Sequence, residues 1–344
     1  MVHVPLRLKL DGDALVANWR WLADRGGGAA CGAAIKADGY GLGARDVVRR
    51  LAEAGCRDFF VATWAEAEAL MPWSEGLNLS VLHGVGEADL PTALSSPARP
   101  VLNSAQQVLR WKESDRPCDV MIDTGINRLG LAAAVAGAGL LQSVRVETLM
   151  SHLACADEDS PVNEKQRQDF IAAAAAVQSR RLSLANSAGI CLGPAYAFDL
   201  TRPGLALYGG IPRPEAEGHV RQVVRIETQI IQRRRVDRGE GVGYNHFFRA
   251  EAPHELAILN LGYADGYLRS FSGTGRARLG EGFAPVLGRV SMDLTAICVD
   301  DAPHLQEGDW VEMDYDLAAA SAQSGLSAYE LLTGLGDRFE RCWV

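Results

Sequence analysis

The sequence predicts an α/β protein, a (β/α)8 TIM-like barrel followed by a mostly β C-terminal domain. From about residue 30 to 210, short apolar runs alternate with amphipathic or alanine-rich stretches, which is the rhythm of repeated βα units. Near residue 220 this rhythm ends, and segments rich in Val, Ile and Thr follow, with Gly, Pro and Asp between them. We therefore expect a barrel over residues 10–220 and a β-rich domain over 221–344, which also takes in an N-terminal strand within residues 1–9.

The elements of the barrel follow from apolar runs of strand length and from helical periodicity. A helix is expected over 12–24, and the stretch 44–54 repeats its apolar residues at the spacing of one helical face. Further helices are expected over 104–113, 131–141 and 162–179. Eight strands, most of them followed by a helix, favour a closed barrel, and an open doubly wound sheet is the alternative. The expected strands are 31–36, 58–63, 79–84, 98–102, 118–123, 145–151, 182–186 and 205–208.

The β-rich domain is expected to contain four main β segments and a late helical stretch. Residues 2–9 alternate apolar and polar side chains like a strand, and they precede the first barrel helix, so they are free to join this domain. A helical pattern returns only at about 317–335. The β segments are expected at 221–236, 255–261, 284–300 and 308–314.

Composition and charge exclude several classes of function. The 344 residues carry 34 basic and 43 acidic side chains, a net charge of −9, and they offer no basic tract for nucleic acid. The longest apolar stretches are too short to span a membrane, and the N-terminus lacks a secretory hydrophobic region. The seven cysteines have no paired spacing and are expected as reduced thiols. We therefore expect a cytoplasmic protein that binds neither nucleic acid nor membrane.

Lys36 is the most informative single residue, because it ends an apolar run and precedes the glycine-rich turn 37–43. Burial of an ammonium group lowers its pKa, and the freed amine suits Schiff-base chemistry with a carbonyl compound. A surface lysine that snorkels off a strand is the alternative. Further polar clusters fall at the ends of predicted strands, the barrel face where active groups collect, and the last cluster, which contains Arg202, leads into the eighth predicted strand. These clusters are 123–128, 151–152, 186–188 and 202–205.

Metal chemistry is not expected from this sequence. His152, Cys155 and Asp157 are the nearest approach to a ligand set, and their spacing matches no standard site. A hydrogen-bonded interior histidine is the simpler account of His152 taken alone. We therefore expect no metal.

Seven short motifs follow one another along the chain. They are Ala34-Ile35-Lys36-Ala37-Asp38-Gly39-Tyr40-Gly41, Asp123-Thr124-Gly125 with Arg128-Leu129-Gly130, Ser151-His152-Leu153-Ala154-Cys155-Ala156-Asp157, Asn186-Ser187-Ala188, Arg202-Pro203-Gly204 with Leu207-Tyr208-Gly209, Gly262-Tyr263-Ala264-Asp265-Gly266 and Gly288-Arg289-Val290-Ser291-Met292-Asp293. In this order and over nearly the whole chain, they resemble the alanine racemases, pyridoxal-phosphate enzymes built from a barrel and a β domain.

The resemblance implies that Lys36 carries pyridoxal 5'-phosphate and that Lys36 and Tyr263 are the two catalytic groups. Racemisation requires an acid/base group on each face of the planar substrate–cofactor adduct. Because Tyr263 lies in the other domain, the resemblance implies a homodimer in which a second subunit supplies it. Arg128 and the Met292 N–H are implied to bind the substrate carboxylate. The other implied cofactor-binding residues are Tyr40, His152, Asn186, Ser187, Arg202, Gly204, Leu205 and Tyr208.

Three of these implied residues carry more specific expectations. Arg202 is expected against the pyridine nitrogen and, with His152, is expected to favour the phenolate of Tyr263. For Tyr208, the alternative to a phosphate contact is an aromatic residue that caps the barrel mouth. For Met292, the alternative to a place in the substrate pocket is ordinary core filling.

The sequence departs from the family pattern at three positions. Leu42 stands where many relatives have histidine, and Met121 stands where many carry a modified lysine that orients the arginine. Near the C-terminus, Asp337 replaces a tyrosine that borders the entrance. These changes bear on the placement of Arg128 and on substrate entry rather than on the two catalytic groups.

The implied function is the interconversion of L- and D-alanine, which supplies D-alanine for peptidoglycan or serves D-alanine catabolism. One alternative is a racemase of serine or of a broader amino-acid set. A pyridoxal-phosphate decarboxylase of similar architecture would have an acidic residue in place of Arg202 and would differ at Tyr263. A cofactor-carrying barrel without catalytic function would lack the β domain.

Overall fold

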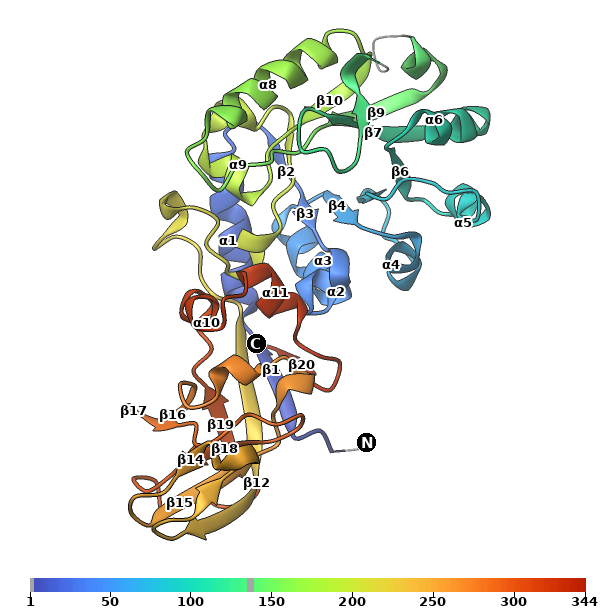
Figure 1. Cartoon of the computed structure of the whole chain (residues 1–344). Helices are drawn as coiled ribbons and strands as arrows, with labels where there is room; N and C mark the ends of the chain where they lie inside the picture. Colours follow the sequence, from blue (N-terminus) through green and yellow to red (C-terminus); the bar gives the residue numbers. More distant parts are fainter. Residues whose placement is uncertain (1–2, 135–138) are drawn as a thin grey trace. The chain divides into compact units, whose positions relative to one another are not determined.

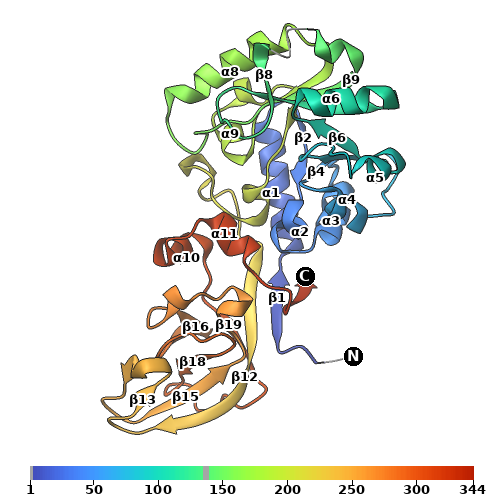
Figure 2. The same ribbon diagram turned by 45° about the vertical axis from the view of Figure 1, so that its right-hand side comes forward.

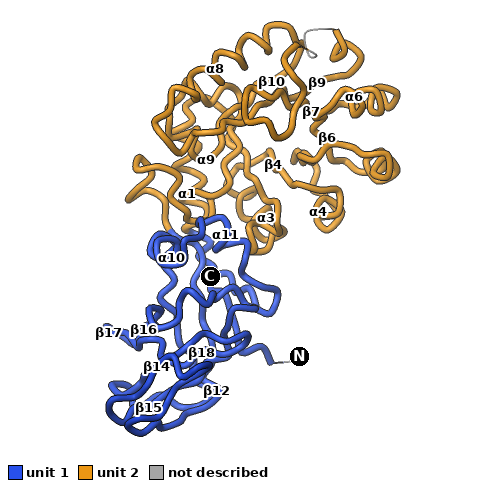
Figure 3. Tube along the Cα trace, in the orientation of Figure 1, with its two compact units in different colours: residues 1–13, 222–344 blue, residues 14–221 orange. Residues whose placement is uncertain are grey.

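The computed structural model describes residues 3–134 and 139–344, which divide into two compact units (Figure 3). The barrel unit comprises residues 14–221, and the β unit comprises the residues up to 13 together with 222–344. In the described part of the chain, no helix is long and apolar enough to cross a membrane.

The barrel unit is built around parallel strands (Figure 1). Strands β3, β4, β5, β6, β7, β9 and β10 pair in this order, and β11 pairs with β2. The ring closes between β10 and β11, because the Asp199 N–H donates to the Leu182 carbonyl (3.0 Å) and the Arg202 N–H donates to the Ala185 carbonyl (2.8 Å). The predicted barrel is therefore confirmed. Its strands are β2 (Ala30–Cys31), β3 (Ala33–Ala34), β4 (Asp58–Val61), β5 (Asn78–Val81), β6 (Arg99–Leu102), β7 (Pro117–Asp123), β9 (Arg145–Met150), β10 (Ser179–Ser183) and β11 (Leu200–Thr201).

Helices follow most of the barrel strands, and Figure 2 shows α4, α5 and α6 outside them. Helix α3 (Ala44–Ala54) has the predicted limits and buries four residues spaced three and four apart on one face. Helix α8 (Pro161–Ala174) begins after Ser160, whose hydroxyl oxygen accepts from the Val162 N–H, and it has proline at its first position. The other helices are α1 (Gly12–Arg25), α2 (Lys36–Tyr40), α4 (Trp64–Ala69), α5 (Leu90–Ser95), α6 (Ala105–Trp111) and α9 (Ser187–Cys191).

The eighth strand lies earlier than the sequence predicts. Residues 205–208 form the 3-10 helix η4 (Leu205–Tyr208), and the eighth strand is β11. All four residues of η4 are buried, and a short apolar run does not distinguish strand from helix by its periodicity. The prediction of a strand at 205–208 is therefore wrong, and Arg202 directly follows the last strand instead of preceding it.

Two other predicted elements differ in detail. The predicted strand 31–36 divides into β2 and β3 and ends before Lys36. The predicted helix 131–141 lies partly outside the described residues. Its first residues form β8 (Leu131–Ala132), which pairs with β7, and its last belong to the 3-10 helix η2 (Leu140–Ser143).

The β unit is organised around the long strand β12 (Val224–Val236), which pairs with β1, β15 and β19. Strand β1 (Leu6–Leu10) also pairs in parallel with the C-terminal strand β20 (Glu340–Trp343). Two helices, α10 (Leu317–Ser324) and α11 (Ala328–Thr333), precede β20. The remaining strands are β13 (Gly241–Val242), β14 (Phe248–Arg249), β15 (His254–Leu259), β16 (Arg276–Leu279), β17 (Gly282–Pro285), β18 (Thr295–Cys298) and β19 (Trp310–Met313).

Candidate active site

Lys36 stands at the start of α2, two residues after β3. The backbone after it is left-handed, with φ of 51° at Ala37, 51° at Asp38 and 57° at Tyr40. Such angles are uncommon outside glycine, and they concentrate at functional sites. The Asp38 carboxylate accepts the Ala44 N–H at 2.8 Å and so joins this turn to the beginning of α3. The predicted glycine-rich turn is therefore a hydrogen-bonded bend that holds Lys36 at the end of the first barrel strand.

Burial lowers the pKa of Lys36, the positive charge of Arg128 lowers it further, and Glu66 opposes this shift. A lysine with a lowered pKa spends more time as the free amine at neutral pH, the form that acts as nucleophile and base. The electrostatics therefore agree with the chemistry expected of Lys36.

Glu66 is a site residue that the sequence analysis missed. One of its carboxylate oxygens accepts the Ala37 N–H at 2.7 Å, and the other accepts the Ala62 N–H at 2.6 Å. It thereby joins the turn after Lys36 to the end of β4. Thr63 and Glu66 form a capping box at the start of α4, and this Thr-x-x-Glu pattern was a readable signal in the sequence.

Ser187 binds two backbone N–H groups of the segment that follows the last strand. Its buried hydroxyl oxygen accepts from the Gly204 N–H at 3.0 Å and from the Ala206 N–H at 3.2 Å. Within the described part of the chain, the Leu205 N–H between these donors has no hydrogen-bond partner. Asn186 orients α9 by accepting the Gly189 N–H at 2.9 Å. The Ser187 hydroxyl proton and the Leu205 N–H therefore provide donors suited to an anion.

Tyr40 lies beside this group of donors. A Cβ added to Gly204 would lie 2.9 Å from the Tyr40 Cζ and closer still to its hydroxyl oxygen, so the Tyr40 ring lies against the Gly204 backbone. The Tyr40 and Tyr208 rings stack with centroids 4.6 Å apart. The buried Tyr208 hydroxyl donates its proton to the Ala34 carbonyl at 2.8 Å. Because that proton is used within the protein, the geometry favours Tyr208 as an aromatic wall over Tyr208 as a phosphate donor.

Arg202 is buried at the end of β11. Its guanidinium donates to the Ser151 carbonyl at 2.5 Å and to the Ser183 hydroxyl. Burial lowers the pKa of Arg202 to about 10, and the negative charge of Asp119 opposes this shift. Arg202 therefore remains a cation at neutral pH.

His152 is neutral in this environment. Its pKa falls to about 3, first because the ring is buried and then because Arg202, Arg128 and Lys36 add positive charge. Arg202, Arg128 and Lys36 therefore all lie within electrostatic reach of His152. His152 can therefore donate or accept a hydrogen bond here, but it does not supply a positive charge at physiological pH.

Arg128 lies in the exposed loop that follows β7. The Asp123 carboxylate shapes this loop by accepting the N–H groups of Gly125, Ile126 and Asn127 at 2.8, 3.0 and 3.2 Å. Met121 is buried in an apolar cluster of the barrel unit, and Leu42 is fully buried. Two of the three positions at which the sequence departs from its relatives, Leu42 and Met121, are thus filled by apolar packing.

Gln166 is a second residue that the sequence analysis missed. From α8 its buried amide accepts the Ala154 N–H at 2.8 Å and donates to the His152 carbonyl at 3.1 Å and to the Thr124 hydroxyl at 3.2 Å. It therefore joins the loop after β7 to the loop after β9. Nothing in the sequence distinguishes Gln166 from the other polar residues of α8, so no local signal could have identified it.

Tyr263 and Met292 lie on adjoining turns of the β unit. The Tyr263 N–H donates to the Ser291 carbonyl, and the Ala264 N–H donates to the Met292 carbonyl, each at 3.0 Å. A Cβ on Gly262 would collide with the Met292 carbonyl, so this approach requires glycine. Tyr263 is 39% exposed and Met292 is 53% exposed. The β unit therefore presents both side chains at its surface, and Met292 does not fill a core.

Arg338 connects the two turns that carry Tyr263 and Met292. It donates to Asp265 at 2.6 Å and to Asp293 at 2.7 Å, and the buried Asp265 carboxylate also accepts the Gly262 N–H at 2.9 Å. Its neighbour Asp337 is exposed. Arg338 therefore acts as a positioning residue for the surface that bears Tyr263.

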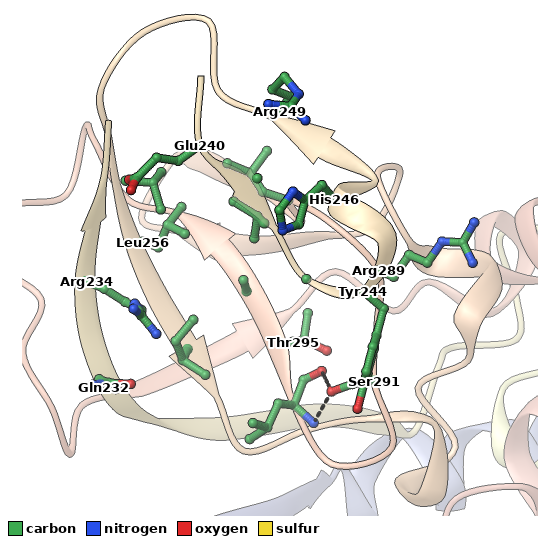
Figure 4. Close-up of a pocket in the computed structure, with 18 of the residues that line it drawn as sticks. Gln232, Arg234, Glu240, Tyr244, His246, Arg249, Leu256, Arg289, Ser291 and Thr295 are labelled. Carbon is green, nitrogen blue, oxygen red and sulfur yellow. Dashed lines mark hydrogen bonds between the residues drawn. The ribbon is translucent and has the colours of Figure 1, made fainter. Parts of the chain in front are cut away.

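The β unit also contains a hollow of about 770 Å³ (Figure 4). Residues of β12, β15, β18 and the β13–β14 hairpin line it, and Ser291, which accepts the Leu294 N–H, stands at its wall. None of the predicted site residues is among the described residues that line this hollow. The predicted cofactor residues all belong to the barrel unit, so the cofactor is not expected here.

Comparisons with known proteins relate both units of the chain to the same kind of enzyme. Residues 10–212 match the family described as alanine racemase, N-terminal domain, and residues 223–343 match alanine racemase, C-terminal domain. An alanine racemase of Acidiphilium cryptum is 41% identical over 97% of this chain and 97% of its own length. A biosynthetic alanine racemase of Agrobacterium fabrum is also 41% identical, over 99% of this chain and 94% of its own length.

A solved structure is similar over the whole chain. The crystal structure of alanine racemase from Bartonella henselae, with covalently bound pyridoxal phosphate, superposes with a TM-score of 0.90. It is 33% identical in sequence, and the match covers 99% of this chain and 100% of that one.

Proposed function

The chain belongs to the alanine racemase family, and from this premise we propose that it interconverts L- and D-alanine with pyridoxal 5'-phosphate bound at Lys36. The observation that carries the proposal is the convergence in the barrel unit of a lysine with a lowered pKa, a set of anion-binding donors and a buried arginine. A binding protein for a neutral ligand would not need this combination.

The residues of the barrel unit fit pyridoxal phosphate. The Ser187 hydroxyl, the Leu205 N–H and the Tyr40 hydroxyl would hold its phosphate, and Gly204 leaves the space for Tyr40 to lie there. Lys36 would bind its carbonyl carbon. When bound, the cofactor supplies a conjugated ring that stabilises negative charge at the substrate α carbon.

Proton transfer is assigned to Lys36 on one face of the substrate and to Tyr263 on the other. Burial and the charge of Arg128 lower the pKa of Lys36, so its Nζ gives up a proton more readily than an exposed lysine and suits the acid/base role. A free tyrosine is a weak acid with a pKa near 10, so Tyr263 needs help to act as a base. We assign the electrostatic stabilisation of the Tyr263 phenolate to Arg202, which is a cation here. We assign a hydrogen bond with Tyr263 to His152, which is neutral.

Arg202 also limits side reactions in this proposal. It keeps its proton at neutral pH, so it would leave the ring nitrogen of a cofactor held beside it unprotonated. The bound ring would then withdraw less charge from the substrate, which would favour return of the proton over transamination. Arg128 and the Met292 N–H are assigned to the substrate carboxylate, which leaves the small alanine methyl group to face Tyr263 and Met292.

We assign the chain to a cytoplasmic homodimer in which Tyr263 of the partner subunit completes each site. The exposure of Tyr263 and Met292 on the β unit supports this assignment. Mixing a Lys36→Ala chain with a Tyr263→Phe chain tests it, because a hybrid dimer would then contain one intact site. Random mixing would restore about one quarter of wild-type activity in a two-fold dimer. A site formed within one chain would give no restoration, and that result would contradict the assignment.

The reaction itself is tested with a panel of L-amino acids. The proposal expects racemisation of alanine with the highest kcat/KM, a cofactor absorbance band in the purified protein, and borohydride labelling of Lys36. Faster racemisation of serine would support the broader-specificity alternative. Absence of the band in protein supplied with cofactor would refute the proposal at its first step.

A further inference from the structure

We propose that His254, Cys298 and Asp300 of the β unit form a binding site for one divalent transition-metal ion, with Zn²⁺ as the ion that they suit best. Nothing in this inference depends on the reaction proposed above. The three ligand atoms, His254 Nδ1, Cys298 Sγ and a carboxylate oxygen of Asp300, all lie within 4.8 Å of one another.

The register of two antiparallel strands brings these residues together. In the pairing of β15 with β18, Leu256 lies opposite Cys298, so continuation of the register sets His254 opposite Asp300. Because side chains alternate between the two faces of a strand, Cys298 and Asp300 lie on the same face, and a directly opposed residue shares that face with them. An imidazole, a thiol and a carboxylate thus meet at one end of the strand pair.

The distances are close to those of a tetrahedral site. The Cys298 Sγ lies 3.8 Å from the His254 Nδ1, which in turn lies 2.7 Å from the Asp300 Oδ2. Zinc bonds of about 2.0 Å to nitrogen or oxygen and 2.3 Å to sulfur place tetrahedral ligand atoms about 3.3 to 3.6 Å apart. The ion would need the carboxylate to move by roughly half an ångström, and water would complete the fourth position.

Neighbouring groups orient two of the ligands, and the site is open to solvent. The second carboxylate oxygen of Asp300 accepts the Glu255 N–H at 2.6 Å, and the Phe248 ring packs against His254 with centroids 5.8 Å apart. Outer partners of this kind fix ligand orientation in metal sites. The His254 side chain is 25% exposed and that of Asp300 is 39% exposed, so an ion can enter from solvent. Binding would release the thiol proton of Cys298 to water as the sulfur–metal bond forms.

A bound ion would link the two strands that lead to the turns of Tyr263 and Met292. Strand β15 leads from His254 to the turn of Tyr263, and β18 leads from the turn of Met292 to Cys298. An ion that joins His254 to Cys298 and Asp300 would clamp these strands together at their far ends. The expected consequence is a more stable strand pair, with no direct part in proton transfer.

Metal binding to the untagged holoenzyme tests the proposal. After equilibrium dialysis against Zn²⁺, we expect the wild type to hold about one zinc ion per chain more than the Cys298→Ser and His254→Ala variants, which should both lack this ion. Cys342→Ser is the matched control, because Cys342 is a half-buried cysteine of the same unit that belongs to no ligand cluster of the described residues, and it should keep the ion. Equal zinc content in the wild type and in Cys298→Ser would overturn the proposal, as would a wild type that binds no zinc.

A second measurement does not depend on the folding of any variant. In the wild-type holoenzyme, Zn²⁺ should slow alkylation of Cys298 by about tenfold or more, because a metal-bound thiolate is withdrawn from reaction. Peptide mass spectrometry would follow Cys298 and Cys342 in the same sample. Protection of Cys298 alone is the expected result. Unchanged labelling of Cys298 at saturating zinc would refute the site.

Discussion

Gly204→Ala tests the assignment of the phosphate site with the smallest possible change. The added Cβ would lie 2.9 Å from the Tyr40 Cζ and nearer to its hydroxyl oxygen, distances that real side chains avoid. Gly204 has a φ of −130°, so no left-handed backbone opposes alanine here, and the contact of the added Cβ with Tyr40 is the effect that the substitution tests. Tyr40 cannot move away freely, because its ring is buried and stacks on the fully buried Tyr208.

The magnitude follows from two effects. Overpacking by one methyl group costs about 1–3 kcal/mol, and this should appear as a lower free energy of unfolding. Displacement of the Tyr40 hydroxyl and of the Gly204–Ser187 contact would remove one hydrogen bond to a charged phosphate, worth about 1.5–3 kcal/mol. The apparent Kd for pyridoxal phosphate should therefore rise by about 10- to 150-fold.

Equilibrium dialysis of the cofactor and chemical denaturation measure the two effects separately. Gly28→Ala is the matched control in the same unit, because its Cβ would meet nothing within 4 Å. That variant should resemble the wild type in both measurements. A Gly204→Ala variant that loses stability yet binds the cofactor within about twofold of the wild type would refute the phosphate assignment.

Substitutions at three further positions test other parts of the account. Arg338→Ala should lower kcat while cofactor loading stays unchanged, because it releases the turns of Tyr263 and Met292, and Arg338→Lys should restore part of the loss; an unchanged kcat would contradict a positioning role. Tyr208→Phe should cost about 1–3 kcal/mol of unfolding free energy by leaving the Ala34 carbonyl unpaired, with little change in cofactor affinity. A large loss of affinity would instead make Tyr208 a phosphate ligand. For His152, the folded pKa of about 3 lies below the ordinary 6.5, so the unfolded chain binds the proton more readily and stability should fall as pH drops from 6.5 toward 3. His152→Asn should flatten that part of the denaturation profile, and an identical pH dependence in both proteins would refute the shift.

The sequence was sufficient for those parts of the fold that have a strong local signal. The apolar spacing of residues 44–54 gave α3 with its observed limits, because a single helical face repeats clearly over three turns. The prediction from sequence failed at 205–208, because all four residues are buried and a short, wholly apolar run has no periodicity that distinguishes a strand from a helix. The end of the first strand before Lys36 accompanies the left-handed turn at residues 37–40, which composition alone does not specify.

For the candidate site, the sequence could not predict which distant segments come into contact. The motifs identified residues that the barrel unit does bring together, such as Lys36, Arg128 and His152. Glu66 carried a local capping signal, whereas Gln166 and Arg338 act through partners far away in sequence. In the cluster of His254, Cys298 and Asp300, 44 residues separate His254 from Cys298, and only strand register places them together. Register is not readable from spacing when both strands are short.

The central claim is that two groups, Lys36 and Tyr263, serve opposite faces of the substrate. It is tested most directly by the exchange of the α hydrogen in D2O, followed by NMR, in the Tyr263→Phe variant. The account predicts that exchange from L-alanine is suppressed while D-alanine still exchanges through Lys36. Unchanged exchange from both enantiomers would contradict it.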